Sequence, residues 1–400
     1  MRAFLFCLFL AALISPLHCE KVLTGLDVLE RDDFKLLENK KVGLITNHSA
    51  LNSSGEHILK VFARAKNFNL AAIFSPEHGF SGEIEGGIHI QNSSSSAGVP
   101  IYSLYGKDKR PSAQMLKGID ILVFDIQDIG ARFYTYLTTM GYAMEEAEKN
   151  NISFLVLDRP NPVGLKMVEG PLLSPEINNF TAYYTVPVRH AMTAGEMAVF
   201  HKKNKKLNLD LKVIRMENYN REMLFPETGL KWVNPSPNIR DFKAEILYPG
   251  LGCFEATNVS VGRGTAEPFH WFGAPWMKGK KIAKKLNAAG LKGVKFFQEY
   301  RTPDADIYSK EKCDGVRAEI TDEKSVRSLD IFVYAAYWLR KISPEKFEIK
   351  KDDIARMTGT GDFYRLIMEG KKPEEIISFF EASNSDFLDR LKKEGILLYE

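Results

Sequence analysis

The chain has 400 residues, 44% of them hydrophobic and 26% charged, which is enough for two folded domains and excludes a disordered or fibrous protein. Its 54 basic and 51 acidic residues are spread along the chain, so no basic surface indicates a nucleic-acid partner. No apolar stretch reaches the roughly 20 residues that a membrane span requires.

Residues 1–19 have the pattern of a secretory signal peptide, with a positive start, an apolar run over 3–14 and a less apolar exit. We therefore expect export to the periplasm or out of the cell, and a mature chain without a membrane span. Lipid attachment at Cys19 is less favoured, because Leu17 and His18 are larger than the residues that usually precede a lipidated cysteine. A retained N-terminal anchor is the third alternative.

From residue 41 onward, short apolar runs alternate with helical patterns. The runs cover residues 42–46, 70–74, 119–124 and 152–157, and the helical patterns cover 55–65 and 137–149. Nearly continuous apolar strands separated by helices predict a parallel sheet covered on both faces, here a Rossmann-like α/β domain over residues 20–241. The G-x-G-x-x-G pattern of dinucleotide-binding domains is absent, and no motif requires a cofactor.

Beyond about residue 230 this alternation gives way to a segment rich in proline and asparagine. Strands are predicted at 293–297 and 315–320, and helices at 326–340 and 374–393. These elements indicate a smaller α+β domain over residues 242–400. Its cysteines, Cys253 and Cys313, lack the spacing of metal ligands, so no metal site is predicted, and whether they form a disulfide stays open.

Polar residues follow each predicted strand of the first domain. Parallel sheets bind ligands beyond the carboxyl ends of their strands, so these residues are candidates for a functional site. They are Asn47, His48, Glu77, His78, Asp125, Asp128, Asp158, Arg159 and Asn161. The last three lie on a segment stiffened by two prolines, which suits a binding loop but also occurs in plain turns.

The segment around Glu77 carries the sharpest chemical signal. Ser75 and Pro76 stiffen its entry, and Gly79 and Gly82 allow a tight loop that can hold one carboxyl group in a partly dry cleft. Partial desolvation raises the pKa of a carboxyl group, as a general acid requires when it protonates a leaving oxygen. The spacing fits equally well with a Glu77 that caps the next helix or pairs with an arginine.

Further acids and aromatic residues extend this candidate site. Glu83 and Glu85 lie in a glycine-rich turn and could supply a second carboxylate, although a solvated loop explains them somewhat better. Arg132 could bind a carboxylate and Tyr134 could stack on a sugar. Alternatively, Asp128 caps a helix on which Arg132 pairs with it.

A second group of polar residues lies near the predicted start of the C-terminal domain. Asn238, Glu255, Asn258 and Arg263 are close in sequence to several tryptophans and phenylalanines. Amides and aromatic rings beside acids are typical of a sugar-binding wall, whereas each single tryptophan is more simply explained as core. The chain has no G-x-S-x-G and no H-E-x-x-H motif, so neither a serine nor a zinc hydrolase is indicated.

Six segments, in order from residue 43 to residue 265, together resemble the exo-β-N-acetylmuramidase family, which was long classed as a domain of unknown function. They cover residues 43–48, 75–80, 124–136, 157–162, 234–238 and 255–265. The resemblance implies a Rossmann-like N-terminal domain, a smaller C-terminal domain and a cleft between them. The glycine-rich stretch over 82–87 follows the family pattern only loosely.

The resemblance also implies a glycosidase that releases N-acetylmuramic acid from the non-reducing ends of peptidoglycan fragments, by hydrolysing its β-1,4 link to N-acetylglucosamine. Peptidoglycan-derived saccharides or muropeptides are then its partners, and cell-wall turnover or recycling its role. Glu77 looks like the family's favoured catalytic residue. We expect His78, Asp125 and Asp128 to orient the sugar or a water molecule.

The sequence leaves the second catalytic group open. Two carboxyl groups about 5 Å apart would indicate a retaining enzyme, a separation of roughly 6.5–9.5 Å an inverting one, and the substrate's acetamido group offers a third route. Arg132, Arg189 or Arg263 could recognise the lactyl carboxylate of muramic acid. Two other classes of protein stay open, a non-catalytic envelope protein that binds muropeptides and an amidase or esterase acting on cell-wall fragments. The oligomeric state is not predicted.

Overall fold

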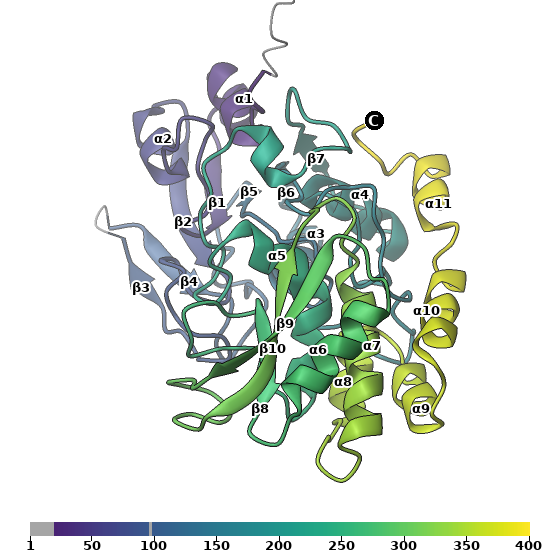
Figure 1. The fold of residues 1–400 in the computed structure, drawn as a ribbon. Coiled ribbons are helices and arrows are strands. Elements are labelled where there is room, and N and C mark those ends of the chain that lie inside the picture. Colours follow the sequence, from purple (N-terminus) through teal and green to yellow (C-terminus); the bar gives the residue numbers. More distant parts are fainter. Residues whose placement is uncertain (1–19, 96–97) are drawn as a thin grey trace, which may run out of the picture.

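The computed structural model describes residues 20–95 and 98–400 of the protein (Figure 1). The predicted signal peptide over residues 1–19, with Cys19, lies outside the described residues, so export and anchoring stay predictions. The described chain forms two sheets with helices around them, the larger sheet in the N-terminal half and the smaller one in the C-terminal half.

The larger sheet has seven strands in the order β3-β4-β2-β1-β5-β6-β7. They are β1 (Lys41–Thr46), β2 (Asn69–Ser75), β3 (Ser93–Ser94), β4 (Pro100–Ser103), β5 (Ile121–Asp125), β6 (Ser153–Leu157) and β7 (Leu211–Ile214). All neighbouring strands are parallel except β3 and β4. The predicted Rossmann-like parallel sheet is confirmed. The chain places β2, β3 and β4 on one side of β1 and then β5, β6 and β7 on the other side. Ligands of α/β proteins bind at the point where the strand order reverses in this way.

Alternate side chains of the central strands pack against opposite faces of this sheet. On one face, Val42 and Leu44 pack with helices α1 (Gly25–Arg31) and α2 (Ile58–Arg64). On the other face, Ile45 and Phe124 join the largest hydrophobic cluster, which includes helices α3 (Tyr136–Lys149) and α4 (Ala194–Lys205). Burial of both faces explains why the strands are apolar at nearly every position.

The smaller sheet is antiparallel, with the strand order β8-β10-β9. The C-terminal elements are α5 (Phe242–Leu251), β8 (Trp271–Ala274), α6 (Gly279–Ala288), β9 (Val294–Arg301), β10 (Cys313–Ile320), α7 (Ser328–Ile342), α8 (Lys351–Thr358), α9 (Asp362–Met368), α10 (Pro373–Ala382) and α11 (Phe387–Lys393). Short 3-10 helices cover Lys35–Leu37, Phe225–Thr228 and Gly252–Ala256. The strands and helices predicted beyond residue 290 correspond to β9, β10, α7 and the pair α10 and α11, so the expected α+β character is confirmed.

The two halves share one hydrophobic core. Phe133, which precedes α3, belongs to the same buried cluster as Ile246 of α5, and its ring lies 5.3 Å from that of Tyr248. Helix α5 begins directly after its N-cap, Asp241. The division into residues 20–241 and 242–400 stays a prediction, because a continuous core draws no boundary at that position.

Two further expectations concern cysteines and membranes. Cys253 and Cys313 are both buried and free, so the disulfide that the sequence left open is not formed. Among the described residues, none of the helices combines the length and the apolar character needed to cross a membrane. In the same part of the chain, no cluster of His, Cys, Asp and Glu side chains is arranged to hold a metal ion.

Helix α5 carries a buried acid, Glu245, whose two carboxyl oxygens have no hydrogen-bond partner within residues 20–95 and 98–400. Burial, with smaller contributions from Asp128 and Asp241, raises the pKa of Glu245 well above its ordinary value of 4.5. The folded protein therefore holds this proton more tightly than the unfolded chain does. The resulting stability is present at pH values below the unfolded pKa and is lost as the pH rises through the folded pKa.

Glu245→Gln removes this titration, because glutamine is neutral at every pH. We expect the unfolding free energy of the variant, relative to wild type, to increase steadily as the pH rises above about 4.5. Urea denaturation of both proteins between about pH 4 and pH 8 measures the difference. A difference that stays constant across this range would show that Glu245 has the same pKa in the folded and unfolded chains.

Candidate active site

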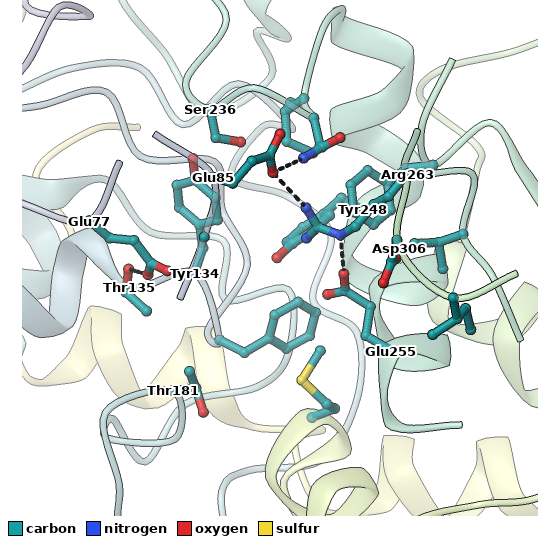
Figure 2. A pocket seen from close by; sticks show the side chains of 18 of the residues that line it. Glu77, Glu85, Tyr134, Thr135, Thr181, Ser236, Tyr248, Glu255, Arg263 and Asp306 are labelled. Atoms are coloured by element: carbon teal, nitrogen blue, oxygen red, sulfur yellow. Dashed lines mark hydrogen bonds and ion pairs between the residues drawn. The ribbon is translucent and has the colours of Figure 1, made fainter. Parts of the chain in front are cut away.

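A cavity of about 630 Å³ lies beyond the carboxyl end of β2 and is closed on its other side by loops of the C-terminal half (Figure 2). One wall carries Glu77, His78, Tyr134 and Thr135. The facing wall carries Asn238, Tyr248, Glu255, Arg263 and Asp306, and Glu85 reaches toward it. Its volume is within the range of small-molecule sites, and both walls present carboxylates to a ligand.

Glu77 lies two residues beyond β2, which ends at Ser75. Its Oε2 accepts a 2.6 Å hydrogen bond from the hydroxyl of Thr135, and its Oε1 accepts one of 3.1 Å from the backbone N–H of Gly87. A Cβ added to Gly86 would lie 3.3 Å from Oε1. The glycine-rich strap, residues 82–87, therefore packs closely on the half-buried carboxylate. Among the described residues, Glu77 caps no helix and pairs with no arginine, and it is held facing the cavity.

His78 is fixed beside Glu77 by its backbone and by its ring. It has a φ of 69°, in the left-handed region that non-glycine residues adopt rarely. Its Nδ1 lies 2.7 Å from the carbonyl oxygen of Ile84 and must donate to it. In the neutral imidazole, Nε2 is then an acceptor, available to a hydroxyl group of a ligand.

Two tyrosines lie beneath this wall of the cavity. The rings of Tyr134 and Tyr136 are 4.8 Å apart and nearly perpendicular, and Tyr136 donates a 2.6 Å hydrogen bond to the carbonyl of Pro235. Burial raises the pKa of both phenols, which therefore stay neutral. Tyr134 lines the cavity but is only 7% exposed, so little of its ring is open to stacking by a sugar.

Arg263 organises the facing wall. Its Nε donates a 2.6 Å hydrogen bond to Glu255, and its Nη1 lies 3.9 Å from Oε2 of Glu85 (Figure 2). The same Oε2 accepts a 2.8 Å hydrogen bond from the side-chain amide of Asn238. Although burial acts in the opposite direction, Glu255 raises the pKa of Arg263, which is a permanent cation. Three of the predicted binding residues, Asn238, Glu255 and Arg263, are thus brought together.

Asp125 and Arg159 form a buried ion pair away from the cavity. The guanidinium of Arg159 contacts both carboxylate oxygens of Asp125, with Nη2 3.0 Å from Oδ2, and its Nη1 donates to the carbonyl of Leu51. Asp125 is completely buried and Arg159 is 4% exposed. Neither side chain lines the cavity, so the structure places both in the protein interior rather than against a substrate.

Asp128 also faces inward. Its Oδ2 accepts a 2.8 Å hydrogen bond from the backbone of Gly130 and lies 3.4 Å from Nε2 of the buried His190. The interpretation of Asp128 as a helix cap paired with Arg132 is wrong, because α3 begins only at Tyr136. Asp128 contacts the interior of the strand-end segment instead of the cavity.

The predicted carboxylate-binding residue Arg132 is buried as well. Its guanidinium donates to the backbone carbonyls of Val186 and Met357, which ties the segment before α3 to the end of α8. Burial lowers its pKa to about 10. Arg189 is buried in an ion pair with Glu169 at 3.0 Å. Of the three arginines considered for the lactyl carboxylate, only Arg263 reaches the cavity.

Asn47 and His48 stabilise the loop after β1. The side-chain oxygen of Asn47 accepts hydrogen bonds from the backbone and the hydroxyl of Ser49. Nε2 of His48 lies 2.7 Å from the carbonyl oxygen of Asn234, and burial lowers the pKa of this histidine. The ring of His48 fills the space where Gly82 would otherwise carry a side chain. Both residues shape the loops around the cavity without lining it.

The remaining predicted residues act as local anchors. Asp158 accepts hydrogen bonds from Thr193, from the backbone of Gly195 at the start of α4 and from Tyr399, and burial raises its pKa to about 6. Asn161 donates its side-chain amide to a backbone carbonyl just before α4. Asn258 exchanges hydrogen bonds with the backbone of the segment between α7 and α8. None of the three lines the cavity.

Comparisons with known proteins identify the relationship. The family models described as exo-beta-N-acetylmuramidase NamZ, N-terminal and C-terminal, match residues 42–243 and 246–399. This chain belongs to the NamZ exo-β-N-acetylmuramidase family. The family resemblance seen in the sequence is therefore confirmed, and the NamZ models together span nearly all of the described chain.

Relatives of known sequence and structure agree with the NamZ assignment. The chain is 39% identical over 375 residues to the peptidoglycan beta-N-acetylmuramidase NamZ of Bacillus subtilis strain 168, covering 93% of this chain and 91% of the relative. Crystal structures of two DUF1343 family proteins from Bacteroides fragilis are similar, with 33% and 31% identity and TM-scores of 0.88 and 0.77. Each comparison covers 95% of this chain and 99% of the solved chain.

Several residues lining the cavity were not foreseen from the sequence. Thr135 lies inside the recognised 124–136 segment, and only the fold shows that its hydroxyl meets Glu77, 58 residues away. Tyr248 and Asp306 come from the C-terminal half, where no spacing pattern marked them. The backbone N–H of Gly87 binds Glu77. The signal that could have indicated this contact is the glycine-rich segment that follows the acid at the end of β2.

Proposed function

We propose that this protein is an exo-acting glycosidase that hydrolyses the β-1,4 bond between a terminal N-acetylmuramic acid and N-acetylglucosamine in peptidoglycan fragments. Membership of the NamZ family and the name of the Bacillus subtilis relative support this activity. The observation that carries the proposal is the single half-buried carboxylate of Glu77, fixed by two hydrogen bonds on one wall of a sugar-sized cavity. Cell-wall turnover or recycling is the corresponding role.

In the proposed reaction, Glu77 protonates the glycosidic oxygen as the bond to the muramic acid breaks, and a water molecule then adds to the anomeric carbon and returns a proton to the Glu77 carboxylate. Thr135 and Gly87 hold its carboxyl group in position, and Nε2 of His78 accepts a hydrogen bond from a sugar hydroxyl. The bond-breaking transition state carries positive charge on the sugar ring. The carboxylates of Glu255 and Asp306 on the facing wall stabilise that charge.

We further propose that the protein acts after export, in the periplasm or outside the cell. The support is the pattern of residues 1–19, whose positive start, apolar run and polar exit are those of a cleaved signal peptide. Peptidoglycan fragments are present in the same compartment. Attachment of a lipid at Cys19 remains the less favoured alternative, because the residues before it are not small.

The activity is tested with the disaccharide that carries N-acetylmuramic acid at its non-reducing end, β-1,4-linked to N-acetylglucosamine. We expect mass spectrometry to detect free N-acetylmuramic acid, while the disaccharide with the two sugars in the opposite order stays intact. Release of a peptide from muropeptides without free sugar would identify an amidase instead. Saturable binding of both disaccharides without any product would identify a binding protein.

A further inference from the structure

The cavity contains a site in which one of the protein's own carboxylates is held by nitrogen donors. Oε2 of Glu85 accepts a 2.8 Å hydrogen bond from Asn238 and lies 3.9 Å from Nη1 of Arg263 (Figure 2). An amide and a guanidinium converging on one oxygen form a receptor for a carboxylate. The amide is firmly placed, because Asn238 is only 4% exposed.

Glu85 is weakly held in this receptor. Its side chain is 56% exposed, and the 3.9 Å separation from Arg263 is too long for a hydrogen bond. It lies on a strap with glycines at 82, 86 and 87, two of which have φ values of +72° and +84°. An added Cβ on Gly87 would meet nothing within 4 Å. An exposed carboxylate on a glycine-rich strap can leave its site without disturbing the core.

Arg263, in contrast, is firmly positioned and has N–H groups that donate no hydrogen bond within the described chain. Its Nε is engaged by Glu255 at 2.6 Å, and its guanidinium lies over the ring of Phe269 at 5.3 Å. Within residues 20–95 and 98–400, neither Nη atom donates a hydrogen bond to the protein. The two Nη groups of a fixed guanidinium suit a planar carboxylate.

We propose that Asn238 and Arg263 bind the lactyl carboxylate of the terminal muramic acid, and that Glu85 occupies this receptor in the empty cleft until the substrate displaces it. The inference rests on the proposed function, because only muramic acid brings a carboxylate on its sugar ring to this cavity. The exchange conserves charge at the receptor: one carboxylate enters as the exposed side chain of Glu85 turns out toward solvent. N-Acetylglucosamine lacks the lactyl group and cannot complete the exchange.

Equilibrium binding separates this inference from catalysis, because it needs no turnover. Titration calorimetry would compare N-acetylmuramic acid, its methyl ester and N-acetylglucosamine on wild type, Arg263→Gln, Asn238→Ala and Glu85→Ala. We expect wild type to bind the free acid about tenfold more tightly than the ester. Arg263→Gln and Asn238→Ala should reduce that preference to nearly nothing, because they weaken binding of the free acid far more than binding of the ester.

Glu85→Ala should tighten binding of the free acid by about three- to tenfold, because the receptor is no longer self-occupied, and leave the ester unaffected. Glu83→Ala is the matched control on the same strap, since Glu83 is exposed and does not line the cavity. Equal affinity of wild type for acid and ester, or weaker acid binding by Glu85→Ala, would overturn the inference alone. Failure of wild type to bind either muramic ligand would overturn it together with the proposed function.

Discussion

Replacing Glu77 with glutamine is expected to lower kcat for the natural disaccharide by about 10²–10⁴-fold, the usual contribution of a general acid. Glutamine keeps the shape of the side chain: its one oxygen can accept from the backbone N–H of Gly87, and its amide can donate to the hydroxyl oxygen of Thr135. It has no proton to give to the leaving oxygen. The loss should therefore fall mainly on kcat and leave the melting temperature almost unchanged.

The leaving group gives this prediction a sharper form. An aryl glycoside of N-acetylmuramic acid departs as a stable phenolate and needs little protonation, so Glu77→Gln should cleave it with a much smaller loss than the disaccharide. Glu83→Gln, on the neighbouring strap and outside the cavity, serves as the control. An equal loss of kcat on both substrates would show that Glu77 has a role other than proton donation. Undiminished turnover of the disaccharide would show that Glu77 is not catalytic.

Asp125→Asn is expected to destabilise the protein by about 3–5 kcal/mol, because it leaves the guanidinium of Arg159 buried without its counter-charge. The pair is almost completely buried, with Asp125 at 0% and Arg159 at 4% exposure. Urea or guanidinium denaturation measures the loss. At temperatures where the variant remains folded, its kcat should stay close to that of wild type, since Asp125 does not line the cavity.

A second replacement tests the cause of this loss. Adding Arg159→Met to Asp125→Asn removes the unpaired charge, so the double variant should be more stable than Asp125→Asn alone. A double variant less stable than the single one would mean that the lost hydrogen bond of Arg159 to Leu51 matters more than the charge. A large fall in the kcat of Asp125→Asn without any loss of stability would show that Asp125 takes part in catalysis.

Much of the fold could be predicted because its signals are local. The apolar runs at 42–46, 70–74 and 152–157 correspond to β1, β2 and β6, each buried on both faces of a parallel sheet. The rule that ligands bind beyond such strands directed attention to Glu77. The same rule also selected Asp125 and Asp158, which lie at the ends of equally apolar strands but turn into the interior.

The sequence by itself determined the fold class, the family and the loop that presents Glu77, since each depends on residues close together in the chain. Only the tertiary structure decided which polar residues meet. It joined Asp125 to Arg159, 34 residues away, and it brought Glu85 to Arg263 across the cavity. Local patterns set where a strand ends, but the direction in which a side chain then points depends on its ion-pair and hydrogen-bond partners, and many of those partners come from distant segments.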